Sequence, residues 1–126
     1  MIIALRAGLV LGGLLLVFIG AGFLLDPTGS GADFGLSAKG AHGLTTIRAD
    51  FTAFFVVGGA SLVWGALARR RDPLLIGAAL MLVTLAGRLV SLAINGPFEG
   101  YIPPMAVELL LGVLGLIGAR VLPPRV

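Results

Sequence analysis

Residues 9–25 read LVLGGLLLVFIGAGFLL and contain no charged side chain. A helix of this length covers roughly 26 Å at about 1.5 Å per residue, close to the roughly 30 Å hydrocarbon core of a bilayer. Three further runs, residues 49–68, 74–94 and 105–122, have comparable length and apolar character, and prolines lie close to their ends. We therefore predict an all-α fold, an integral membrane four-helix bundle that forms one domain over residues 1–126.

The composition of the chain supports a membrane protein over a soluble one. Hydrophobic residues make up 58% of the chain and charged residues 12%, against usual shares of about 45–50% and about 25% in soluble domains. Too few polar side chains remain to cover a water-exposed surface, so membrane lipids are the expected surroundings. The formal net charge of +3 would suit nucleic acid. However, the arginines stand at the ends of apolar runs and form no basic face, so we predict no nucleic-acid partner.

Arginines are distributed unevenly between the two ends of the predicted spans. Lys39 and Arg48 fall at one end, and six arginines fall at the other: Arg6, Arg69, Arg70, Arg71, Arg120 and Arg125. Positively charged loop residues concentrate on the cytoplasmic side of membrane proteins. We therefore predict that both termini are cytoplasmic (N-in/C-in), and that residues 26–48 and 95–103 face outward.

The outer loop and the glycines give two further expectations. The loop of residues 26–48 is too long for a tight turn, and we expect residues 36–46 to form a short helix along the membrane surface. Small residues recur at helical spacing at Gly8 and Gly12, and at Gly112, Gly115 and Gly118. Such spacing lets helix backbones approach closely in lipid. It favours packing within the bundle, with a homo-oligomer interface as the alternative.

Charged side chains recur near the outer end of the predicted bundle. Arg88 precedes Asn95 by seven residues, which places it roughly 10 Å below the outer end of its span. Glu108 lies roughly 6 Å below the outer end of the fourth span. Arg48 and Asp50 stand at the outer end of the second span. We therefore predict one polar cluster, for binding or for structure, that comprises Arg48, Asp50, Arg88, Asn95 and Glu108.

The cost of a charge in lipid predicts how this cluster pairs. An unpaired charge near the bilayer centre costs about 2.5–3.5 kcal/mol on insertion scales, so Arg88 should meet a carboxylate. Glu108 matches its depth best, and Asp50 is the second choice. Arg48 could join them in a network of two arginines and two carboxylates. Such a cluster could fix helix register, or it could form a polar pocket that holds an anion, a lipid headgroup or a proton.

The sequence offers little for metal or cofactor chemistry. The chain has no cysteine and one histidine, so disulfides, thiol chemistry and cysteine-ligated metals are excluded. His42 could not hold a metal without carboxylate help. We predict no metal site and no cofactor.

Three short motifs resemble a known family. IRADF at residues 47–51 opens a span, GRLVSLAINGP at residues 87–97 closes another, and a glutamate lies early in the last. The pattern resembles a bacterial family of four-span membrane proteins known as domain of unknown function 4345, and its architecture is similar to that of small DoxX-like proteins. The matching positions are Arg48, Asp50, Gly87, Arg88, Gly96, Pro97 and Glu108. The resemblance implies four spans in a bacterial inner (cytoplasmic) membrane and no particular activity. The family typically has Asp where this chain has Asn95.

Three functional classes remain open on the sequence. The first, which we favour, is a non-catalytic membrane protein that binds a lipid or small molecule, or serves as a subunit of a larger membrane complex. The second is a membrane enzyme that acts on a lipophilic substrate with Glu108 or Asp50 as acid or base, although the usual catalytic side chains are scarce. The third is a small proton-coupled transporter, although no inverted repeat or broken helix is evident.

Overall fold

The computed structural model describes residues 1–124 and is all-helical over that range, which confirms the predicted fold class. Its long helices are α1 (Ile2–Leu25), α4 (Thr52–Ala68), α5 (Arg71–Asn95) and α6 (Ile102–Val121). Shorter elements lie between α1 and α4: α2 (Pro27–Asp33), α3 (Gly40–Thr46) and a π-helical turn, η1 (Ile47–Phe51). Four helices are long and apolar enough to cross a membrane. Helices α1 and α5 include their predicted runs, and α6 ends one residue short of its run. The run of residues 49–68 begins in η1 and continues through α4, within the candidate span Gly40–Ala68.

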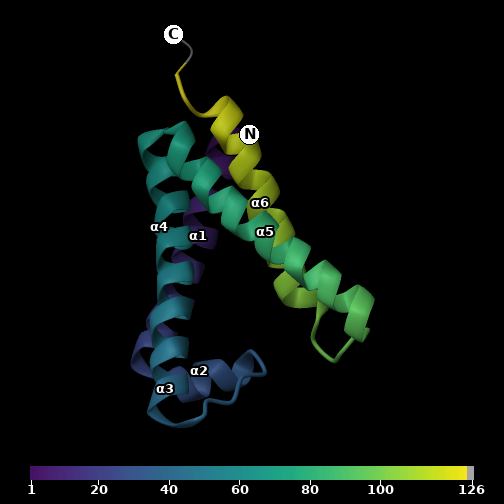
Figure 1. Cartoon of the computed structure of the whole chain (residues 1–126). Coiled ribbons are helices and arrows are strands. Elements are labelled where there is room, and N and C mark those ends of the chain that lie inside the picture. Colours follow the sequence, from purple (N-terminus) through teal and green to yellow (C-terminus); the bar gives the residue numbers. More distant parts are fainter. Residues whose placement is uncertain (125–126) are drawn as a thin grey trace.

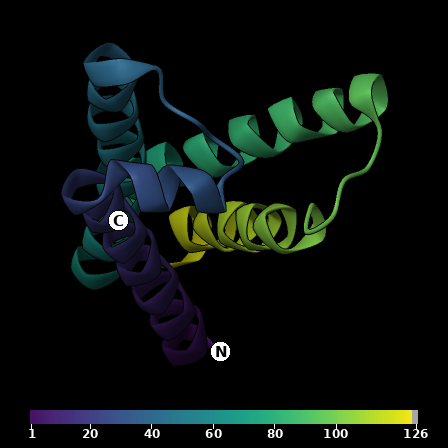
Figure 2. The same cartoon turned by 90° about the horizontal axis from the view of Figure 1, so that it is seen from below.

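The four long helices form two pairs that meet at one end and diverge at the other. Helices α1 and α4 lie side by side, and so do α5 and α6 (Figure 1). The pairs meet where α1 begins and α6 ends, which we call the narrow end. Seen from below, α5 and α6 extend away from α1 and α4 (Figure 2). The far end, which we call the wide end, holds α2, α3 and the loop between α5 and α6.

The narrow end contains the best-packed part of the core. Leu9, Leu62, Leu74 and Leu122, one from each long helix or its end, are all fully buried. A tight turn joins α4 to α5 there, with Arg69 in the left-handed region at φ 55°. The Nε of Arg69 donates a hydrogen bond to the main-chain oxygen of Leu122 at 2.9 Å. This bond joins the end of α4 to the end of α6, beside the leucine core that both pairs share.

Glycines allow the helices to approach closely, as the sequence spacing suggested. A Cβ atom at Gly13 would lie 2.6 Å from the main-chain oxygen of Gly59, so α1 and α4 touch backbone to backbone. Gly112, Gly115 and Gly118 face side chains of α5 and α1. Packing within the bundle is therefore confirmed for these three glycines.

The segments at the wide end differ from expectation. Helix α3 is continuous with α4 through η1, because the residues at the two junctions keep right-handed helical dihedral angles: Thr46, Ile47, Phe51 and Thr52. Residues 36–46 therefore do not form a separate surface helix. The helix that lies across the long axes is α2 (Figure 1). Asp26 caps its N-terminus by accepting a hydrogen bond from the Gly29 amide at 3.0 Å, and Pro27 occupies its first turn.

The arginines counted in the sequence separate between the two ends of the fold. Arg6 lies in the first turns of α1, Arg69 to Arg71 lie in the turn between α4 and α5, and Arg120 lies in the last turn of α6. All five belong to the narrow end, whereas Lys39 and Arg48 belong to the wide end. Arg125 lies outside the described residues.

Candidate functional site

Arg88 of α5 and Glu108 of α6 form an ion pair inside the bundle. The Nε of Arg88 donates to Glu108 Oε1 at 2.7 Å, which is the pairing that the depth of the two residues predicted. The Arg88 side chain is 29% exposed and the Glu108 side chain 9%. The pair therefore belongs to the protein interior on the carboxylate side and opens outward on the guanidinium side.

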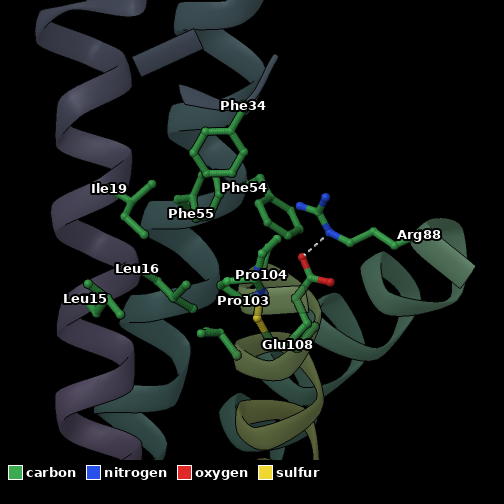
Figure 3. Close-up of a pocket in the computed structure, with 12 residues that line it drawn as sticks. Leu15, Leu16, Ile19, Phe34, Phe54, Phe55, Arg88, Pro103, Pro104 and Glu108 are labelled. Carbon is green, nitrogen blue, oxygen red and sulfur yellow. Dashed lines mark hydrogen bonds and ion pairs between the residues drawn. The ribbon is translucent and has the colours of Figure 1, made fainter. Parts of the chain in front are cut away.

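The ion pair leaves hydrogen-bonding groups unused. Within residues 1–124, the bond from Nε is the only one that Arg88 makes, so its two terminal nitrogens, Nη1 and Nη2, have no acceptor. Figure 3 shows them on the side of Phe54, away from Glu108. The second oxygen of Glu108, Oε2, is buried without a partner in the described chain. A buried polar group without a hydrogen-bond partner costs free energy. The hydrogen-bonding capacity of this site is therefore only partly used by the protein itself.

A pocket lies between the two helix pairs, beside this ion pair. One part of it has a volume of about 180 Å³ and is lined mainly by apolar side chains from all four long helices. Leu15, Leu16 and Ile19 of α1 form one wall, opposite Arg88, and Pro103 lies at the start of α6 (Figure 3). An adjoining part of about 270 Å³ extends toward η1 and shares the ion pair. The divergence of the helix pairs therefore creates an apolar pocket with one polar edge.

Phenylalanine rings form the side of the pocket nearest the wide end. Phe34, which follows α2, packs on Phe55 of α4 with ring centres 5.6 Å apart, and Phe54 meets Phe55 edge to face at 5.0 Å. The fully buried Phe23 of α1 stacks on Phe55 at 5.6 Å. Phe51 lies on Phe23 at 4.9 Å. Contacts of this kind add to the free energy of apolar burial, so the aromatic wall is a built part of the fold.

The π-helical turn η1 places Asp50 beside the same pocket. Asp50 lines the larger part together with Arg88 and Glu108. No ion pair joins it to Arg88 within the described chain, where the only such pair is Arg88–Glu108. π-Helical turns occur often at functional sites, and this turn directs one acidic side chain toward the pocket.

Two residues of the predicted cluster lie elsewhere. Arg48 does not join the network that the sequence suggested, because its Nε donates to the main-chain oxygen of Leu24 at 3.1 Å and caps the end of α1. Asn95 is exposed, and its amide donates to Ser91 one turn earlier in α5 at 3.3 Å. The structure thus brings together Arg88, Glu108 and Asp50. Among residues 1–124, no three His, Asp or Glu side chains form a group that could hold a metal ion.

Several lining residues were missed in the sequence, although some signals were present. Phe51, Phe54 and Phe55 follow Asp50 at helical spacing on one face, and Thr84 precedes Arg88 by one turn. Phe34 carried no such signal, because it lies in a loop whose fold depends on α2.

A family model described as a domain of unknown function, DUF4345, matches residues 4–119. The chain belongs to this family. The match covers all four long helices except the first two residues of α1 and the last two of α6. It includes every residue that lines the pocket, so the site is part of the DUF4345 domain. No curated protein and no solved structure matches the chain in the other two comparisons.

Proposed function

We propose that this DUF4345 protein binds a membrane amphiphile, a lipid or a lipophilic small molecule, without converting it. The observation that carries the proposal is the apolar pocket with the unengaged Nη groups of Arg88 at its edge. The apolar part of the ligand would lie against α1 and the phenylalanine wall. A polar head with an oxygen acceptor would receive hydrogen bonds from the Nη groups of Arg88, for which the protein supplies no acceptor of its own among residues 1–124.

The size of the pocket supports a ligand of this class. An apolar protein cavity of about 150 Å³ is large enough to hold benzene. The two adjoining parts, at about 180 and 270 Å³, leave room for a ring or several methylene groups. Because Arg88 and Glu108 line both parts of the pocket, the head group of the ligand would lie at the ion pair whichever part holds its apolar portion.

The arrangement of Glu108 favours binding over catalysis. Oε1 accepts the hydrogen bond from Arg88, and Oε2 is enclosed. A general acid or base must reach the substrate atom with which it exchanges a proton. Neither oxygen of Glu108 is free to do so in this arrangement, which disfavours Glu108 as the acid or base of an enzyme and leaves Asp50 as the candidate for that role.

We further propose that the wide end of the molecule faces outward from a bacterial cytoplasmic membrane. Five described arginines belong to the narrow end, with Lys39 and Arg48 at the wide end. Positive residues favour the cytoplasmic side. The pocket would then open toward the outer leaflet.

Cysteine labelling tests this orientation, because the chain has no cysteine of its own. Ser37→Cys, exposed at the wide end, should react with a membrane-impermeant maleimide added to intact cells. Ala68→Cys, exposed at the narrow end, should react only after the membrane is permeabilised. The reverse pattern would overturn the proposed orientation.

Filling the pocket tests the binding proposal. Val107 of α6 lines the pocket, and Val113 of the same helix is exposed. We expect native mass spectrometry of the purified wild-type protein to detect a copurifying amphiphile. Val107→Phe should lower the occupancy of the amphiphile at least about tenfold, because the added ring fills part of the pocket. A tenfold loss needs a decrease of only about 1.4 kcal/mol in binding free energy.

The same substitution at Val113 is the control and should leave occupancy unchanged. Equal thermal midpoints of the two variants would show that both are folded. Unchanged occupancy in Val107→Phe would contradict the proposal. Conversion of the retained molecule by wild-type protein would favour the enzyme.

A further inference from the structure

The arginines at the narrow end divide into two groups by what they contact. Arg6 and Arg69 donate to main-chain carbonyl oxygens near the ends of α4 and α6, at 3.0 and 2.9 Å. The guanidinium of Arg70 lies 5.6 Å from the centre of a tryptophan ring. These three side chains are engaged within the fold, and their positions have a structural reason.

The other two arginines line a groove. Arg71 is the first residue of α5, and Arg120 lies in the last turn of α6. Within residues 1–124, neither makes a side-chain hydrogen bond or an ion pair, although both are exposed to the groove, whose volume is about 500 Å³. The remaining lining is mostly apolar and comprises Leu75, Leu116, Ala119, Pro123 and Pro124. The groove thus combines two unengaged guanidinium groups with an apolar floor.

We propose that this groove binds the phosphate group of an anionic phospholipid. Guanidinium groups present several N–H donors in one plane and suit phosphate oxygens. Basic pockets at the ends of transmembrane helices recognise anionic headgroups. The apolar floor formed by Leu75 and Leu116 would contact the adjoining part of an acyl chain, which a free phosphate lacks. This groove is at the opposite end of the molecule from the pocket at Arg88, so the proposal stands independently of that pocket.

Lipid titration of the full chain in detergent micelles tests the groove. The probe is phosphatidylglycerol, compared with phosphatidylcholine of the same acyl chains, and bound lipid is counted by native mass spectrometry. Each arginine near a headgroup is expected to contribute about fivefold in affinity, so Arg71→Gln with Arg120→Gln should weaken phosphatidylglycerol binding about 25-fold. Binding of phosphatidylcholine should change little.

A second double variant controls for charge alone. Arg70→Gln with Lys39→Gln also removes two positive charges but leaves the groove intact, and it should stay within about twofold of wild type in phosphatidylglycerol affinity. Equal losses in both double variants, or no loss in the groove variant, would overturn the proposal. If the groove variant does not fold, the single change Arg120→Gln, at an exposed position, should still give the loss of about fivefold expected for one arginine.

Inorganic phosphate separates the two sources of the phosphate group. For a lipid site, millimolar phosphate should displace little phosphatidylglycerol from the wild-type protein, because the acyl chain adds contacts. Full displacement by phosphate at that concentration would show that the groove serves a free anion, and the lipid assignment would be wrong.

Discussion

Glu108→Ala should destabilise the folded protein more than Arg88→Ala. The first change strands a guanidinium, which stays charged under all ordinary conditions. The second strands a carboxylate, which can bind a proton and become neutral. Breaking a buried pair costs about 3–5 kcal/mol, and we take this as an upper value for Glu108→Ala. The Arg88 side chain is 29% exposed, so partial solvation should reduce the cost.

A double-mutant cycle in bicelles measures whether the two side chains interact. With the free energy of unfolding as the readout, Arg88→Ala and Glu108→Ala should show a coupling of about 0.5–3 kcal/mol. Strictly additive effects would mean that the two residues do not pair in the membrane. Asp50, which lines the same pocket, would then become the preferred partner of Arg88.

Gly13→Ala should also be destabilising, although alanine usually stabilises a helix relative to glycine. The new Cβ would lie 2.6 Å from the main-chain oxygen of Gly59 and 2.7 Å from Val63 Cγ2. A backbone atom cannot move aside as a side-chain terminus can, so α1 and α4 must separate. Overpacking of this kind costs about 1–3 kcal/mol, which should exceed the helix-propensity gain of about 0.8–1 kcal/mol.

Gly87→Ala is the matched control for this prediction. Gly87 is also helical, but a Cβ atom there would meet nothing within 4 Å. It should therefore be neutral or slightly stabilising in the same unfolding assay. If Gly13→Ala were as stable as Gly87→Ala, the backbone contact between α1 and α4 would not be present in the membrane.

Much of this fold could be predicted from the sequence, because lipid imposes simple rules. Spanning segments must be apolar over a fixed length, which located all four long helices. Opposite charges at similar depth in a membrane are expected to pair. This rule predicted the ion pair of Arg88 and Glu108. Both inferences need only helix rise and connectivity.

The rest of the site depends on packing that hydropathy does not encode. Arg48 could not be assigned, because capping the end of α1 requires knowing that the Leu24 carbonyl oxygen lies beside η1. Asn95 is the last residue of α5 and is exposed, away from the ion pair. The divergence of the two helix pairs, which creates the pocket, follows from contacts at the narrow end. Phe34 reaches that pocket only because α2 lies across the wide end.

Under the proposed function, the ion pair of Arg88 and Glu108 presents the Nη groups of Arg88 to a ligand and does more than fix the helices. The variant that replaces both, Arg88→Met with Glu108→Leu, tests this claim, because removing a buried pair together often restores stability. The measurement is the amount of copurifying amphiphile that this variant retains, determined by native mass spectrometry alongside its free energy of unfolding. We predict stability close to wild type and loss of most of the bound amphiphile. Wild-type retention in a stable double variant would contradict the account and leave the pair a purely structural role.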